Sequence, residues 1–180
     1  MRRRLAPSLK FSAANSPVPF PEFTQLSPNR DLAPTHERAG VCCHHSAMAF
    51  DATIAHMLSF ANKVSYHCLI APNGSRCTLV PDDQIAWHAG DSTFLGRSRC
   101  NDFLLSLAFA GDTYATPLSV QQIDSAVEWI MPRQVLHGWA LDHITDHRQI
   151  SPGRKTDLNP VEWQRLHTAL ARAYSTLGKS

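Results

Sequence analysis

The stretch Phe103-Leu104-Leu105-Ser106-Leu107-Ala108-Phe109-Ala110 decides the fold. It is a nearly continuous apolar run, and it is bounded by Asn101-Asp102 on one side and Gly111 on the other. A short apolar run between turn-forming residues is typical of a strand in the interior of a sheet. We therefore expect residues 103–110 to form a central strand.

Further strands are predicted upstream of this run. Residues 41–47 are apolar at first and end in polar residues, which indicates a buried strand with a polar end. Residues 64–70 and 76–80 flank the turn sequence Pro72-Asn73-Gly74. This pattern predicts a hairpin.

Three helices are predicted around these strands. Asp51 is expected to cap a short helix, and Ser119-x-x-Gln122 is a capping box that opens a long one, which Pro132 should kink or end. Asn159-Pro160 starts a final helix after an irregular segment that begins at Gly138. The predicted apolar face is Ile54, Met57, Leu58 and Ala61 in the first helix, Ile123, Ala126, Val127 and Ile130 in the second, and Trp163, Leu166, Ala169, Leu170 and Tyr174 in the third. The expected fold class is α/β, with a mixed central sheet flanked by helices.

Composition and charge exclude several classes of protein. The chain has 180 residues, of which 43% are hydrophobic and 18% charged, so one globular domain is expected. A net charge of +2 with dispersed basic residues argues against a nucleic-acid partner. No apolar run is long enough to span a bilayer. The 5 cysteines are an odd number without C-x-x-C spacing, so we expect free, buried thiols in a reducing cytoplasm.

The N-terminal part differs in composition from the rest. Residues 1–37 are rich in proline and show no apolar periodicity, so we expect an irregular arm that wraps the domain or is partly disordered. A single domain should follow over residues 38–180. Three arginines at positions 2–4 are followed by no sustained apolar region. We therefore expect no Sec signal peptide and a cytoplasmic location, with release by a phage-type route as the alternative.

The segment His147-Arg148-Gln149-Ile150-Ser151-Pro152-Gly153-Arg154-Lys155-Thr156-Asp157 contains an imidazole, a turn, a lysine and a carboxylate. If residues 155–157 are extended, Lys155 and Asp157 point to the same face. A second imidazole is available at His44, which ends an apolar strand, whereas His45 should point the other way. Two imidazoles and one carboxylate, with room for water, have the composition of a catalytic zinc site.

Six motifs in this order resemble the zinc-dependent N-acetylmuramoyl-L-alanine amidases, which share a fold with phage amidases and peptidoglycan-recognition proteins. The motifs are His44-His45-Ser46-Ala47, Val64-Ser65-Tyr66-His67-Cys68-Leu69-Ile70 with the Asn73-Gly74 turn, Val80-Pro81, Ala86-Trp87-His88-Ala89-Gly90, Arg99-Cys100-Asn101-Asp102-Phe103 and Pro152-Gly153-Arg154-Lys155-Thr156-Asp157. They cover roughly residues 38–175. The resemblance is greatest to the cytosolic branch that acts on 1,6-anhydromuramoyl peptides during wall recycling.

The resemblance implies a role for each matching residue. It makes His44, His147 and Asp157 the zinc ligands, and it makes Lys155 the lysine that stabilises the transition state. It also implies hydrolysis of the amide bond between N-acetylmuramic acid and L-alanine. The residues expected to line the substrate cleft are Trp87, His88, Asn101 and Arg154.

The chain departs from the recycling branch in two ways. Ala108 stands where that branch carries a catalytic glutamate on the central strand. Tyr66, in turn, stands where phage amidases and catalytic recognition proteins place an active-site tyrosine. With a pKa near 10, a tyrosine is a poor general base. We therefore expect Tyr66 to orient water or to donate a hydrogen bond to the oxyanion.

Two other functions fit the same resemblance. One is a non-catalytic peptidoglycan-binding module, because a fold alone does not establish activity. The other is a prophage or secreted lytic amidase. The expected partner is in each case a muropeptide or peptidoglycan fragment, and the sequence leaves the oligomeric state open.

Overall fold

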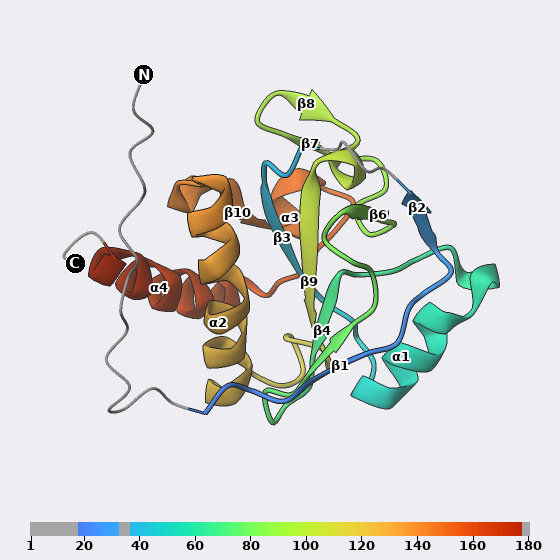
Figure 1. Ribbon diagram of the computed structural model, residues 1–180, viewed down its shortest axis with the longest axis horizontal. Helices are drawn as coiled ribbons and strands as arrows, with labels where there is room; N and C mark the ends of the chain where they lie inside the picture. The colour runs from blue at the N-terminus through green and yellow to red at the C-terminus, as the bar shows by residue number, and fades with distance from the viewer. Residues whose placement is uncertain (1–17, 33–36, 178–180) are drawn as a thin grey trace, which may run out of the picture.

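The computed structural model describes residues 18–32 and 37–177, whose centre is a six-stranded sheet in the order β1-β5-β4-β9-β3-β10 (Figure 1). Only β4 and β5 are antiparallel neighbours in this sheet. Its strands are β1 (Glu22–Thr24), β3 (Gly40–His45), β4 (Cys68–Ile70), β5 (Arg76–Thr78), β9 (Leu104–Phe109) and β10 (Ile144–Asp146). This mixed sheet confirms the predicted fold class.

Helices and two small antiparallel ribbons surround the sheet. The ribbons pair β2 (Arg30–Leu32) with β6 (Gln84–Ala86) and β7 (Thr93–Phe94) with β8 (Arg97–Ser98). The helices are α1 (Phe50–Leu58), α2 (Val120–His137), α3 (His147–Ile150) and α4 (Pro160–Leu177), with short 3-10 turns at Phe60–Asn62, Cys100–Asp102 and Leu141–His143. No helix among residues 18–32 and 37–177 has both the length and the apolar character to cross a bilayer.

Strand β9 is central, as the apolar run predicts. It lies between β4 and β3, and all its residues are buried. One face of β9 packs with α2 and α4, and the other face contacts a cluster that includes α1 (Figure 1). In the parallel register between β3 and β9, His44 pairs with Ala108. The sheet therefore places Ala108 beside a candidate metal ligand.

Helix α2 begins as predicted but does not end where expected. The Ser119 hydroxyl accepts a hydrogen bond from the Gln122 amide, and the Gln122 side chain accepts one from the Ser119 amide. Of the two expected effects of Pro132, a kink or an end of the helix, the second is wrong, because α2 continues to His137. Burial of Trp129 and Ile130 against the sheet offsets the roughly 3 kcal/mol that an interior proline costs.

The region from α1 to β4 differs from the prediction in detail. Ala49, not Asp51, is the N-cap of α1. Asp51 lies in the first turn, where its negative charge interacts favourably with the helix dipole and stabilises the helix. Leu58 is 39% exposed, so the buried apolar face of α1 consists of Ile54 and Met57. The predicted strand over residues 64–70 is shortened to Cys68–Ile70, because the residues before it hydrogen-bond to other segments.

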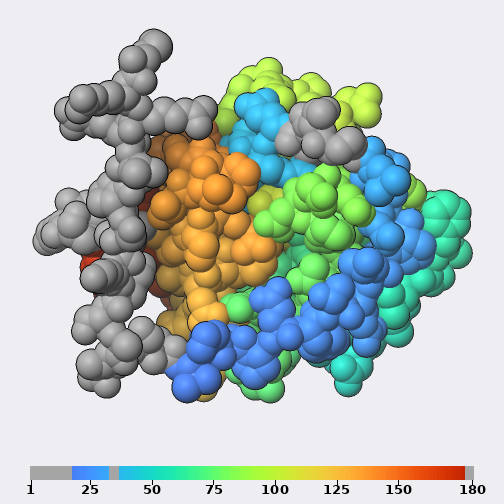
Figure 2. All heavy atoms as spheres, viewed as in Figure 1, coloured from blue at the N-terminus to red at the C-terminus, as the bar shows by residue number. Residues whose placement is uncertain are grey.

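The described part of the N-terminal arm contains two short strands. Residues 22–24 add strand β1 to the edge of the sheet, and residues 30–32 pair with β6. Figure 2 shows residues 18–32 as a blue band across the surface. The Phe20 amide donates a hydrogen bond to the Glu128 carboxylate of α2, and the Ser27 hydroxyl donates one to the Met57 carbonyl of α1. The rest of the predicted arm, residues 1–17 and 33–36, lies outside the described residues. The 5 cysteines are free and buried, as expected.

Gly40 allows β3 and β10 to approach closely. A Cβ atom at this position would lie 2.1 Å from the backbone oxygen of His143, which precedes β10. We expect Gly40→Ala to lower the free energy of unfolding by about 1–3 kcal/mol, since overpacking forces the backbone to shift. Urea unfolding of both proteins measures this difference. An unchanged midpoint would mean that the two strands do not depend on this contact.

Candidate active site

Strand β3 carries two histidines at its C-terminal end, and only one of them faces the site. His44 is 1% exposed and lies on the same face as Ala108. His45 points to the other face, where its Nδ1 accepts a hydrogen bond from the Thr113 amide (3.1 Å). This alternation is what a regular strand requires.

His147 is held by regular structure in a segment for which the sequence predicts an irregular course. The segment after Gly138 is not irregular, because it contains β10 and the short helix α3. Asp146 is the N-cap of α3 and accepts a hydrogen bond from the Gln149 amide (2.9 Å). An aspartate three residues before Gln149 is the signal that could have revealed this helix start.

The two ends of the His147–Asp157 segment are joined by the backbone. The Arg148 amide donates to the carbonyl of Asp157 (2.7 Å), and the Lys155 amide donates to the carbonyl of Ser151 (3.0 Å). The loop is thus closed on itself, and the Asp157 side chain returns to the first residue of α3. Asp157 is buried, with 8% of its surface exposed.

The three predicted ligands converge. The Nδ1 atoms of His44 and His147 are 3.0 Å apart, and Asp157 Oδ2 is 3.2 Å from each of them. All three residues are buried. β3, α3 and the following loop therefore bring one ligand atom each to a common point.

The donor set fits a zinc ion. His147 Nε2 lies 3.2 Å from the Ala89 carbonyl, which can only accept, so Nε2 carries the hydrogen and Nδ1 presents a lone pair. This lone pair faces the Nδ1 of His44 and the carboxylate of Asp157. The three atoms are electron-rich and repel one another, so a cation bound between them would stabilise the arrangement. Ligand atoms about 2.0–2.1 Å from a tetrahedral zinc lie roughly 3.3 Å from one another, close to the separations found here.

The protonation states suit metal binding as well. Burial lowers the pKa of His44 to about 4, and the neighbouring His147 adds to this effect, so the imidazole is neutral at pH 7. Burial alone would raise the pKa of Asp157, but the adjacent imidazoles outweigh it and hold the pKa below its usual range. A neutral imidazole and an ionised carboxylate are the forms that coordinate metals.

Tyr66 and Ala108 form the wall next to His44. The rings of Tyr66 and His44 are 5.2 Å apart, and both Tyr66 and Ala108 are buried in the cluster that includes α1. Burial, with a smaller contribution from the Asp157 charge, raises the pKa of the Tyr66 hydroxyl above its usual value of 10. Tyr66 therefore stays protonated and can donate a hydrogen bond, while Ala108 contributes no titratable group.

Lys155 is a cationic residue whose charge acts on the candidate ligand His44. Its side chain is half-buried, and its charge is one of the causes that lower the pKa of His44. Among residues 18–32 and 37–177, no carboxylate forms an ion pair with it. The ammonium group is thus available for a negative charge that develops near the ligands.

Two of the four predicted substrate-binding residues line one cavity. Trp87 and Asn101 lie in the wall of a cavity of about 260 Å³ together with Gly90 and Arg99. The Trp87 indole is fixed by a hydrogen bond to Asp31 (2.8 Å). Asn101 Oδ1 accepts from the amides of His88 and Ala89, so it also holds the backbone beside the ligands.

The other two residues lie elsewhere. His88 is 6% exposed and contacts His44, so it does not line an open cleft as we expected. Arg154 is exposed and lines a neighbouring cavity of about 240 Å³, where its guanidinium donates to the carbonyls of Ala89 and Asp91. The side chain of Arg154 therefore remains close to the ligands but is already engaged with backbone oxygens.

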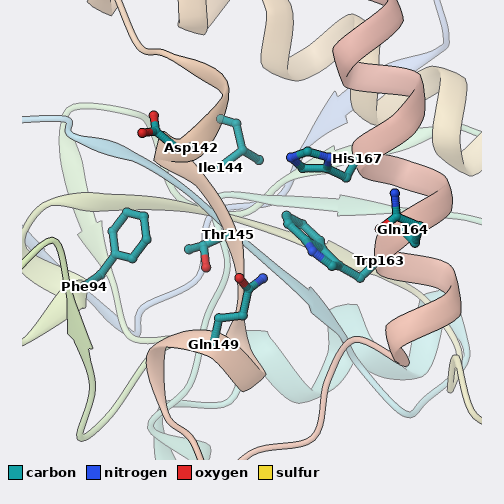
Figure 3. A pocket seen from close by; sticks show the side chains of 8 residues that line it. All are labelled: Phe94, Asp142, Ile144, Thr145, Gln149, Trp163, Gln164 and His167. Atoms are coloured by element: carbon teal, nitrogen blue, oxygen red, sulfur yellow. The ribbon is translucent and has the colours of Figure 1, made fainter.

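A further cavity of about 290 Å³ lies beside strand β10 and helix α4 (Figure 3). Trp163 and His167 of α4 face it from one side, and Phe94 faces it from the other (Figure 3). None of the predicted ligands or catalytic residues lines it. The chemistry is therefore assigned to the cluster at His44.

Known proteins are similar to this chain in sequence and in fold. Residues 34–160 match the family described as N-acetylmuramoyl-L-alanine amidase. The 1,6-anhydro-N-acetylmuramyl-L-alanine amidase AmpD of Salmonella typhimurium (strain SL1344) is 38% identical over an alignment of 128 residues that covers 69% of this chain and 64% of that protein. The chain thus spans slightly less than two thirds of the length of this relative.

Solved structures agree with the sequence match. A crystal structure of a selenomethionine derivative of AmpD has a TM-score of 0.69 at 25% identity, covering 82% of this chain and 93% of that one. A complex of the amidase AmiD from E. coli with anhydro-N-acetylmuramic acid-L-Ala-D-γ-Glu-L-Lys has a TM-score of 0.66 at 24% identity, covering 73% of this chain and 57% of that one.

Proposed function

Because the chain belongs to the N-acetylmuramoyl-L-alanine amidase family, we propose that it is a zinc hydrolase that cleaves the amide between N-acetylmuramic acid and L-alanine. The proposed substrates are muropeptides, including those with the 1,6-anhydro sugar. The observation that carries the proposal is the convergence of His44, His147 and Asp157 on one point. Three protein ligands leave a fourth position open, as a catalytic rather than a structural zinc site requires.

The bound zinc would supply a nucleophile at neutral pH and polarise the scissile carbonyl. The chain's own residues have three further tasks. Lys155 presents its ammonium group to the oxyanion that develops on the carbonyl oxygen. Tyr66 donates a hydrogen bond in the same region, because its hydroxyl stays protonated. Trp87 and Asn101 offer a cavity wall for the sugar or the peptide, and Arg154 offers a planar cation for a peptide carboxylate.

Metal analysis and a cleavage assay test this function together. The purified chain is expected to hold one zinc per molecule and to release L-alanine-terminated peptide from muropeptides. A chelator should stop the release, and added zinc should restore it. Bound zinc without any released peptide would contradict the hydrolase.

A comparison of two substrates tests the choice between recycling and lysis. The similarity to AmpD, whose name specifies the 1,6-anhydro substrate, favours anhydromuropeptides. We therefore propose a cytoplasmic role in recycling. Turnover of these compounds should exceed turnover of intact sacculi. Faster cleavage of sacculi would instead favour a lytic amidase.

A non-catalytic binding module is the second candidate. Ala108 favours it, because no carboxylate stands at this position next to His44. The ligand set and Lys155 favour the enzyme, because a module that only binds peptidoglycan needs neither. Zinc-independent binding of muropeptides without cleavage would support the module.

The role of Tyr66 can be tested by removing its hydroxyl. Tyr66→Phe should lower turnover roughly 10²-fold, the lower end of the loss on removal of one oxyanion donor, and leave the zinc content unchanged. The ring and its packing against His44 are retained, so folding should not change. Unchanged turnover would exclude the hydroxyl from the mechanism.

A further inference from the structure

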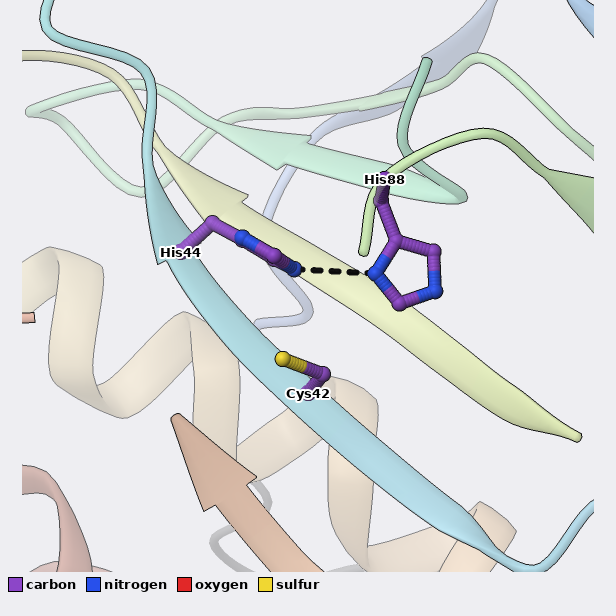
Figure 4. A group of neighbouring side chains, drawn as sticks. All are labelled: Cys42, His44 and His88. Atoms are coloured by element: carbon purple, nitrogen blue, oxygen red, sulfur yellow. Dashed lines mark hydrogen bonds between the residues drawn. The ribbon is translucent and has the colours of Figure 1, made fainter. Parts of the chain in front are cut away.

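His88 lies behind His44, on the side away from the other two ligands. Its Nδ1 is 3.0 Å from His44 Nε2, and the two rings meet edge to face with centroids 5.1 Å apart (Figure 4). The backbone of His88 is fixed by its amide, which donates to Asn101 Oδ1 (3.0 Å). His88 is therefore a buried and well-anchored neighbour of a ligand.

The hydrogen bonds of His88 define where the protons are. Its Nε2 lies 3.4 Å from the backbone carbonyl of Leu104, which can only accept, so Nε2 carries the hydrogen. The Nδ1 of a neutral His88 is then an acceptor, and it takes the hydrogen of His44 Nε2. This leaves the lone pair of His44 on Nδ1, the atom that faces His147 and Asp157.

We propose that His88 is a positioning residue that holds His44 in the tautomer with its Nδ1 lone pair directed at the metal. The proposal rests on the zinc site of the proposed function. Ligating histidines usually donate their second N–H to a carboxylate, a carbonyl or water. Here a neutral imidazole takes that place, and it is itself oriented by the Leu104 carbonyl.

The two metal-binding histidines thus receive their orientation from the backbone by different routes. His147 donates directly to the Ala89 carbonyl, whereas His44 reaches the Leu104 carbonyl through His88. Because His88 and Ala89 are adjacent, one short segment sets both tautomers. Asn101 accepts hydrogen bonds from both amides of this segment and keeps it in place.

A second metal ion is the competing interpretation of the same geometry. Cys42 lies next to His44 and His88 (Figure 4), and the ligand atoms of the three lie within 4.8 Å of one another. A metal in that position would require His44 to bind through both nitrogens. The hydrogen bond between His44 Nε2 and His88 Nδ1 satisfies both nitrogens without a second ion. We therefore favour a positioning role for His88 over a second metal site.

Two substitutions separate the hydrogen bond from the volume of the ring. His88→Asn keeps an acceptor near the position of Nδ1, and His88→Leu fills the space without one. Zinc affinity is measured by competition with a chelator, and the visible spectrum of the Co²⁺-substituted protein reports the ligand geometry. Loss of an outer partner typically lowers metal affinity 10–100-fold, which is the decrease we expect for His88→Leu together with a changed Co²⁺ spectrum. His88→Asn should restore most of the affinity and the spectrum.

Urea unfolding of the metal-free variants distinguishes positioning from packing. Cys42→Ala removes a neighbour that is outside the hydrogen-bond chain, so it should leave zinc affinity and stoichiometry unchanged. The proposal would be overturned if His88→Leu bound zinc as tightly as the wild type. It would also be overturned if both His88 variants lost zinc affinity equally and in proportion to their loss of unfolding free energy. Two metal ions per chain, falling to one in Cys42→Ala, would establish the second site instead. The metal readouts do not depend on cleavage, so a chain that binds zinc but cleaves nothing refutes only the proposed function.

Discussion

Replacing His147 by alanine is expected to abolish zinc retention and, with it, cleavage of muropeptides. The variant leaves one imidazole and one carboxylate at a point where three ligand atoms now lie 3.0–3.2 Å apart. The loss of affinity should far exceed the roughly 10–100-fold that an outer partner contributes. Zinc content after dialysis and turnover of an anhydromuropeptide measure the two effects.

His45→Ala is the matched control for this experiment. His45 is adjacent to His44 in sequence but points to the opposite face and bonds to Thr113. This variant should keep its zinc and should lose some stability at most. Full zinc retention in His147→Ala would refute the ligand set, whereas equal zinc loss in both variants would indicate a folding defect.

Much of the fold follows from local sequence patterns. The apolar run of β9, the turn between β4 and β5 and the capping box at Ser119 each depend on residues close together in the chain. The edge strands β1 and β10 could not be predicted in this way. Each has three residues and exists because it pairs with a partner that is distant in sequence.

The site shows the same division. Resemblance to a family predicts His44, His147 and Asp157 as the ligands, and the structure brings their candidate ligand atoms together. The place of His88 could not be inferred, because it depends on contacts with His44 and Leu104, which lie in two strands of the sheet. From sequence alone, a Trp-His pair in a loop is as compatible with a cleft wall as with a buried neighbour of a ligand. In the structure, Trp87 lines a cavity, whereas His88 is buried against His44.

The absence of a carboxylate at Ala108 limits how the site can move protons. Ala108 is fully buried and pairs with His44 in the sheet. Its methyl group cannot accept or donate a proton, so this position offers no substitute for the carboxylate. Tyr66 stays protonated and cannot act as a base at neutral pH. In the proposed hydrolase, catalysis would then depend on stabilising negative charge rather than on a protein base. This increases the importance of a cation near the candidate ligands that has no carboxylate partner and no hydrogen bond to the backbone among the described residues.

That cation is Lys155, and Lys155→Met is expected to lower kcat about 10²–10³-fold, equivalent to roughly 2.7–4 kcal/mol of transition-state stabilisation. Methionine keeps most of the side-chain volume and removes the charge. KM and zinc content should change little, because Lys155 is neither a ligand nor part of the cavity wall at Trp87.

Lys155→Arg serves as the matched control. It keeps the positive charge but replaces a compact ammonium group by a planar guanidinium, so its kcat should fall between those of the wild type and Lys155→Met. Steady-state kinetics with an anhydromuropeptide and zinc analysis of all three proteins provide the comparison. If Lys155→Met lost zinc in parallel with activity, the lysine would support the metal site rather than the oxyanion. If kcat were unchanged, charge stabilisation would have to come from the metal and Tyr66 alone.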